Sequence, residues 1–299
     1  MSHRQPLVFV PANGMARPVY RKMLVGLSHR FVASGMERLG HDPAFPVTEA
    51  WPRLVDQLRP YLAAAGGPVT LLGHGSGGWL ALLAAYRVPE RVRAVILLDA
   101  PVPGPAQARL LAWVKRLGLG ALPGLACGLD RPSTSALDPD CLPAYRRFAC
   151  QSTDAASQAA HKRLAAHEPD ARCAAPDGRR FDAAVRRRLH ATWPDAIGRL
   201  VAGGAPVDGQ GRVVPVGFLL GTQSPLARRC GLAASRRLAG DHLRAIEGSH
   251  LFPLERPLVT AKEVVHLHDR MVRFAAAPVA ARPVGDAARL LPGRAHAAA

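Results

Sequence analysis

The stretch Val69–Trp79 (VTLLGHGSGGW) most constrains the fold of this chain. Four apolar or β-branched residues lead into a glycine-rich corner, and beyond it Trp79–Ala85 is apolar enough and long enough to form a buried helix. The pattern predicts a strand, a sharp turn and a helix, in which small residues let strand and helix approach closely. In sheets built from such units, ligands bind at the carboxyl ends of the strands. We therefore expect a site at this turn.

The turn resembles the nucleophile elbow of the α/β-hydrolase superfamily, spelled G-x-S-x-G and commonly Gly-His-Ser-x-Gly-Gly. Two registers are open. With Gly75 at the apex, the flanking glycines fall where the family has small residues, but Ser76 is one position late and the nucleophile is missing. With Ser76 at the apex, His74 occupies a place that requires a small residue. A glycine-rich turn without chemistry is a third alternative.

The length of 299 residues suits one α/β domain with an inserted cap. No apolar run is as long as a membrane-spanning helix. The start, MSHRQPLVFV, has too short an apolar stretch and no small-residue cleavage site for a signal peptide. We therefore expect a soluble, cytoplasmic protein with no membrane span.

The cysteine count and the charge bear on cofactors and partners. Five cysteines without C-x-x-C spacing argue against a disulfide framework or a zinc site. The net charge of +17 favours acidic small molecules, nucleic acid or an anionic membrane. However, no zinc-finger or aromatic RNA-binding signature accompanies it, and the wealth of Ala, Arg, Gly and Pro also fits a GC-rich genome. We expect a small-molecule substrate, acidic if the charge is functional, with no nucleic-acid partner, metal or cofactor.

The first expected strand is Leu7–Val10. The turn after it resembles the family's His-Gly loop, with Asn13 in place of the histidine. The resemblance implies that backbone N–H groups of Asn13, Gly14 and Met15 contribute to an oxyanion hole. The alternative is an ordinary Asn-Gly turn. Because this loop comes so early, the first two strands of the full fold are expected to be absent.

Helices and strands then alternate. The pattern predicts a helix at Tyr20–Leu27, a strand at Arg30–Ser34 and a helix with apolar residues at helical spacing over Trp51–Ala65. The continuous apolar run Val92–Leu98 is typical of a strand buried on both faces, and Asp99 stands at its carboxyl end.

The alternation breaks over residues 101–206, where the family inserts a cap. The basic run Arg186–Arg188 in this region is either a solvated helix face or a patch facing the substrate. We expect a core of residues 1–100 and 207–275, a cap of 101–206 and a disordered tail of 276–299.

The returning core contains four further elements. Val213–Leu220 is a strand whose Pro215 suits an edge or bulged position. A helix at Arg228–Leu238, a strand at His242–Ile246 and a helix at Pro257–Phe274 follow it.

The segment after the last strand, Glu247–Pro257, resembles the one that carries the catalytic histidine of the superfamily, which corresponds to His250. Most relatives carry the triad's acid where this chain has Ser224, so Asp99 is the nearest available acid. The alternatives are a structural loop histidine at His250 and a strand-end cap at Asp99. His74 is expected to be a packed residue of the elbow.

The fold class is therefore α/β, with a mostly parallel central sheet, helices on both faces and an inserted helical cap. The first functional hypothesis is a hydrolase of an ester, thioester or related acyl bond. Ser76 would attack, His250 would move the proton, Asp99 would orient the histidine, and the N–H groups of Gly77 and of the Asn13–Met15 loop would hold the oxyanion.

The second hypothesis is a noncatalytic binding protein of the same fold, with Gly75 at the nucleophile position. A third makes the basic surface a platform for nucleic acid or an acidic membrane, and salt-sensitive binding would distinguish it.

Overall fold

The computed structural model describes residues 4–117, 136–148, 185, 188–189, 191–192, 197–224 and 231–276. Two arginines of the basic run, at 186 and 187, lie outside the described residues. So does the expected disordered tail, except its first residue, Ala276, which ends the last helix.

The centre of the molecule is a six-stranded sheet in the order β2-β1-β3-β4-β5-β6. Every neighbouring pair in this sheet is parallel. The sheet is the mostly parallel one that the sequence predicts, and β1 is its first strand along the described chain. The strands are β1 (Gln5–Val10), β2 (Phe31–Gly35), β3 (Val69–His74), β4 (Val92–Leu98), β5 (Val216–Gly221) and β6 (Leu243–Ile246).

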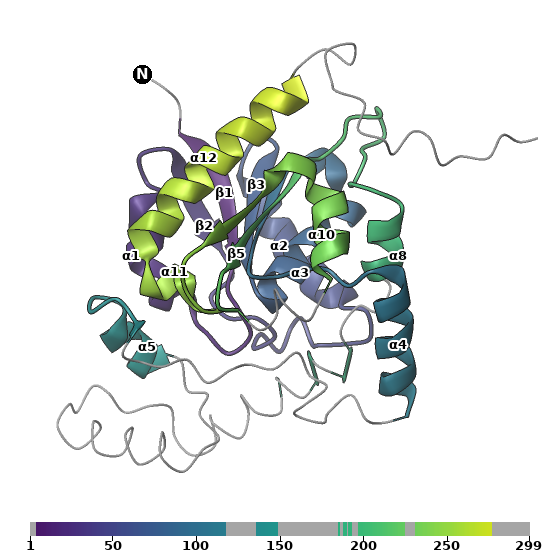
Figure 1. Ribbon diagram of the computed structural model, residues 1–299, viewed down its shortest axis with the longest axis horizontal. Coiled ribbons are helices and arrows are strands. Elements are labelled where there is room, and N and C mark those ends of the chain that lie inside the picture. Colours follow the sequence, from purple (N-terminus) through teal and green to yellow (C-terminus); the bar gives the residue numbers. More distant parts are fainter. Residues whose placement is uncertain are drawn as a thin grey trace, which may run out of the picture.

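Helices cover both faces of the sheet (Figure 1). Helices α1 (Arg21–Gly26) and α12 (Pro257–Ala276) cover one face, and α2 (Pro52–Ala64), α3 (Ser76–Arg87), α8 (Ile197–Ala202) and α10 (Leu232–Ala239) lie on the other. Further helical elements of the described residues are η1 (Arg17–Tyr20), η2 (Pro89–Arg91), η6 (Gly240–His242), α4 (Pro105–Arg116), α5 (Leu142–Phe148) and α11 (Phe252–Glu255).

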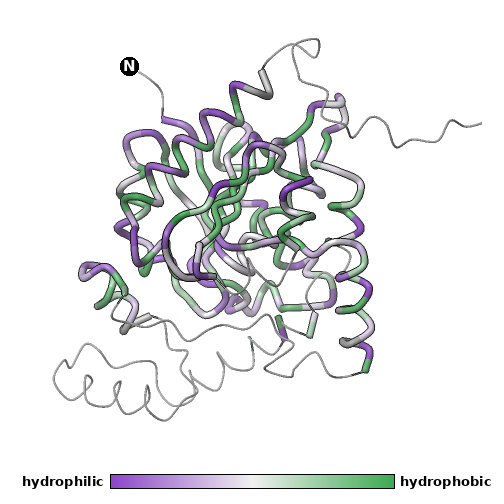
Figure 2. The backbone as a smooth tube through the Cα atoms, in the orientation of Figure 1, coloured by the Kyte–Doolittle hydropathy of each residue, from purple (hydrophilic) through white to green (hydrophobic). Residues whose placement is uncertain are grey.

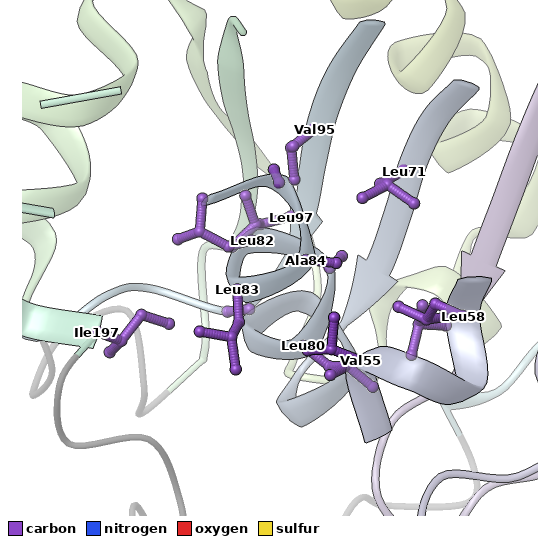
Figure 3. Close-up of a cluster of buried hydrophobic side chains, with 14 of the residues drawn as sticks. Val55, Leu58, Leu71, Leu80, Leu82, Leu83, Ala84, Val95, Leu97 and Ile197 are labelled. Atoms are coloured by element: carbon purple, nitrogen blue, oxygen red, sulfur yellow. The ribbon is translucent and has the colours of Figure 1, made fainter. Parts of the chain in front are cut away.

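The core forms on both faces because alternate residues of a strand point to opposite sides. Leu72 packs toward α12, and its neighbour Leu71 packs toward α3. Figure 3 shows Leu80 and Leu82 of α3 together with Leu71 in the buried cluster on the α3 side of the sheet. The central strands are accordingly hydrophobic along their length (Figure 2). Complete burial of each such leucine stabilises the fold by about 1.5–3 kcal/mol.

One strand differs from its expected place. β5 lies inside the sheet, between β4 and β6, and not at an edge. It starts at Val216, directly after Pro215, whose carbonyl accepts a hydrogen bond from the N–H of Val95 (3.0 Å). Because the proline stands just before the strand, its missing N–H removes no bond from the interior of the ladder.

The described parts of the expected cap rest on the core. Leu137 and Cys141 are buried against the face that α12 covers, and Lys22 of α1 pairs with Asp138 (2.8 Å). The division into core and cap stays a prediction.

Candidate active site

The elbow is built around Gly75. β3 ends at His74 and α3 starts at Ser76, so Gly75 is the single residue between strand and helix. Its backbone has φ +53° and ψ −124°, a conformation that costs residues with a side chain about 1–3 kcal/mol. Its N–H donates to the carbonyl of Leu98 (2.9 Å), and its carbonyl accepts from the N–H of Gly78 (2.9 Å). The structure therefore places Gly75, not Ser76, at the apex.

The neighbouring glycines explain this register. A Cβ at Gly73 would collide with the backbone of Gly77, and a Cβ at Gly77 would collide with the carbonyls of Val10 and Pro11. The positions that need small residues are thus counted from Gly75. Ser76 is instead the first, half-buried residue of α3.

Asp99 and His250 form the polar centre of the site. Nδ1 of His250 lies 2.6 Å from Oδ2 of Asp99, which is fully buried at the end of β4. The same carboxylate accepts the N–H of Gly221 (2.9 Å) and the hydroxyl of Ser224. Ser224 stands where most relatives carry the acid, so its proximity to Asp99 follows from its place after β5. No pattern in the sequence predicts this contact.

Burial acts to raise the pKa of Asp99, but the hydrogen bond and charge of His250 and the bonds from Ser224 and Gly221 outweigh it. The pKa of this carboxyl is consequently below its ordinary value of 3.8. Asp99 is an anion at neutral pH, and Nδ1 of His250 is the donor in their bond.

His250 faces the apex of the elbow. A Cβ built on Gly75 would lie 3.3 Å from both Nε2 and Cε1 of the imidazole and 3.5 Å from the Cβ of Ala12. A hydroxyl carried by that Cβ would be within hydrogen-bond reach of Nε2. The site thus has a paired imidazole and carboxylate beside a position without a side chain.

His74 lies behind His250 and is completely buried. Its Nε2 donates to the backbone carbonyl of His250 (2.9 Å), and its Nδ1 accepts from the hydroxyl of Tyr20 (2.7 Å). The hydroxyl of Tyr20 also accepts the N–H of Ala12 (3.3 Å). Burial, together with the charge of His250, lowers the pKa of His74 from 6.5 to about 3, so this ring is neutral. His74 is packed, as expected, but it also links the two loops of the site.

The loop after β1 differs in part from its expected role. The N–H of Met15 donates to the carbonyl of Ala12 (3.1 Å), so Met15 is not a free oxyanion donor. The N–H groups of Asn13 and Gly14 make no backbone bond within the described residues. On the elbow side the family's donor is the residue after the apex, which is Ser76 and not Gly77.

In the described part of the chain, no three His, Cys, Asp or Glu side chains are grouped so that they could hold a metal ion. Among the same residues, no helix has the length and hydrophobicity needed to cross a bilayer.

Comparison with known proteins agrees with this geometry. The sequence model of the alpha/beta hydrolase family matches residues 7–264. The chain therefore belongs to the α/β hydrolase family. No curated protein sequence matches it significantly.

Solved structures of the same fold are distant in sequence. A carboxylesterase structure from the archaeon Nitrososphaera gargenis is 16% identical with a TM-score of 0.52, over 91% of this chain and 93% of that one. Epoxide hydrolase VrEH1 from Vigna radiata is 13% identical with a TM-score of 0.56, over 91% and 92%. A peroxisomal α/β-hydrolase of Saccharomyces cerevisiae is 14% identical with a TM-score of 0.56, over 94% and 80%. At these identities the similarity shows the fold.

Proposed function

We propose that this chain hydrolyses an ester or thioester bond with water as the nucleophile, and that His250, oriented by Asp99, is the general base. The observation that carries the proposal is the pairing of His250 with Asp99 (2.6 Å) beside the vacant side-chain position of Gly75. The base and its orienting acid are complete, and only the attacking hydroxyl is missing. A similarity to esterase structures supports an acyl substrate.

The proposed reaction has two steps. Nε2 of His250 takes a proton from a water molecule at the Gly75 position while the water oxygen attacks the acyl carbon. Backbone N–H groups of Ser76 and of the Asn13–Gly14 turn bind the resulting oxyanion. The intermediate then expels the alcohol or thiol, which receives the proton from His250, and the acid product leaves. No acyl-enzyme forms in this scheme.

Two alternatives compete with this proposal: a different nucleophile, and a protein that binds without catalysis. Attack by Ser76 is disfavoured because Ser76 lies one residue beyond the apex. The noncatalytic binding protein is favoured by the glycine at the apex, since loss of a triad nucleophile removes most of the rate. Serine hydrolases without a triad member still retain about 10³–10⁴-fold catalysis over water. A slow hydrolase is therefore the expectation.

The test uses p-nitrophenyl esters and acyl thioesters with the wild type, His250→Ala and Ser76→Ala. We expect linear product formation without a burst, no fluorophosphonate labelling, at least a roughly 100-fold loss in His250→Ala and little change in Ser76→Ala. His29→Ala, at an exposed histidine, controls for nonspecific imidazole catalysis.

A burst and a label that Ser76→Ala removes would establish the serine mechanism instead. No hydrolysis above the buffer rate, together with binding of unreactive acyl analogues, would establish the binding protein.

A further inference from the structure

The side-chain oxygen of Asn13 is a buried, unsatisfied hydrogen-bond acceptor. Only 8% of the residue is exposed, and Oδ1 has no partner in the part of the chain that the structure describes. Buried carboxamides are normally satisfied, because an orphaned acceptor loses its bond to water and gains nothing in return. Such an atom beside a catalytic centre indicates a partner that arrives with the substrate.

The backbone on both sides of Asn13 is fixed against the site. Ala12 donates its N–H to Tyr20 (3.3 Å), and its carbonyl accepts the N–H of Met15 (3.1 Å). The Cβ of Ala12 lies 3.5 Å from the vacant Cβ position of Gly75. Asn13 therefore lies in a turn held by hydrogen bonds, and this turn borders the Gly75 position where the attacking water is proposed to bind.

Other orphaned polar atoms lie elsewhere. Gln5, Thr70 and Arg93 each have one, but they belong to the first two residues of β1, β3 and β4. In a parallel sheet those residues are at the end opposite the active site. Their orphaned atoms are thus unrelated to substrate binding.

We propose that Asn13 determines substrate specificity by binding a hydroxyl group on the carbon next to the reacting carbonyl. This inference rests on the proposed function. The backbone N–H of Asn13 is a proposed donor to the carbonyl oxygen, and only the short asparagine side chain separates that N–H from Oδ1. A hydroxyl on the adjacent carbon of the acyl group is similarly close to the carbonyl oxygen, so one residue holds both groups.

The donor is assigned as a hydroxyl and not as an ammonium group because the chain carries a net charge of +17, which disfavours cationic ligands. The substrate class is accordingly a 2-hydroxyacyl ester or thioester. An acyl group without the hydroxyl leaves Oδ1 unsatisfied, and we expect it to be disfavoured by about 10- to 100-fold.

The test compares S-(2-hydroxypropanoyl)- and S-propanoyl-N-acetylcysteamine as substrates, with the released thiol as the signal. Calorimetric binding of the unreactive 2-hydroxypropanamide and propanamide is measured in parallel. We expect the wild type to prefer the hydroxylated compound by about 10- to 100-fold in kcat/KM and in affinity. Asn13→Leu, which has the same branched arrangement of side-chain atoms but no acceptor, should abolish the preference.

Gln57→Leu is the matched control, because Gln57 is also a buried carboxamide with an orphaned oxygen but belongs to α2. It should leave the preference unchanged. A preference seen in binding without any turnover supports the role of Asn13 and contradicts the proposed hydrolysis. No preference in either measurement, or a preference that survives Asn13→Leu, overturns the inference.

Discussion

The imidazole of His74 donates a hydrogen bond to the backbone carbonyl of His250 (2.9 Å), and the two rings stack with their centroids 4.6 Å apart. His74 thus holds the loop of the proposed base from behind. Through Tyr20 it is also connected to the loop after β1. Both loops of the site depend on one neutral, buried ring.

Stability should therefore depend on pH through His74. Its pKa is about 3 in the folded protein and about 6.5 in the unfolded chain, so the unfolded state binds more protons between these values. The stability that neutral His74 contributes to the folded state is complete above pH 6.5 and is lost as the pH falls toward 3. We expect the free energy of unfolding to fall by about 1.4 kcal/mol per pH unit from this group.

Denaturant unfolding of the wild type and His74→Gln between pH 8 and pH 5 measures this effect. The glutamine can still donate to the carbonyl of His250 but does not titrate, so the variant should lose this part of the slope. Identical slopes in the two proteins would show that His74 does not titrate in this way.

The variant Asp99→Asn tests the orienting acid. Asparagine cannot hold the imidazole of His250 in the same tautomer, so we expect kcat to fall by roughly 100-fold, as in His250→Ala, with little change in substrate binding. Steady-state kinetics with a saturating ester separates the two parameters. Unchanged turnover would mean that another carboxylate, or none, orients His250.

Ser224 should support catalysis through Asp99. Removing its hydroxyl in Ser224→Ala takes one hydrogen bond from a fully buried carboxylate. We expect a loss of about 1–3 kcal/mol in stability, a higher pKa for Asp99 and a modest fall in kcat at unchanged KM. The pH at which kcat falls off on the acid side of the pH–rate profile should also be higher in Ser224→Ala than in the wild type. A stability loss alone would mean that the bond is only structural.

Several individual strands and helices could be predicted because they depend on local sequence pattern. The apolar run Val92–Leu98 is β4 with the same bounds, and the elbow stretch is a strand, a turn and a helix. The interior place of β5 was not predictable, since Pro215 acts one residue before the strand.

The site itself needed three-dimensional information. The register of the elbow depends on what a Cβ would meet at two glycines. At Gly73 it would meet the backbone at the start of α3, and at Gly77 it would meet the carbonyls at the end of β1. The partners Tyr20 and His74 are 54 residues apart, and Asp99 and Ser224 are 125 apart. No periodicity in the sequence encodes such contacts.

Substitution of Gly75 tests the central feature of the site. Gly75→Ser would place a hydroxyl within reach of His250, at a strain of about 1–3 kcal/mol from its positive φ. Gly75→Ala carries the same strain and the same Cβ without the hydroxyl, so it is the matched control. We expect Gly75→Ser to raise kcat for p-nitrophenyl esters at least roughly 100-fold, with a burst and fluorophosphonate labelling, while Gly75→Ala shows neither.

Ser76→Ala should change the activity little, because Ser76 lies one residue beyond the apex. If Gly75→Ser gains nothing over Gly75→Ala and Ser76→Ala abolishes a robust activity, the apex position of Gly75 does not explain the chemistry, and Ser76 is the nucleophile.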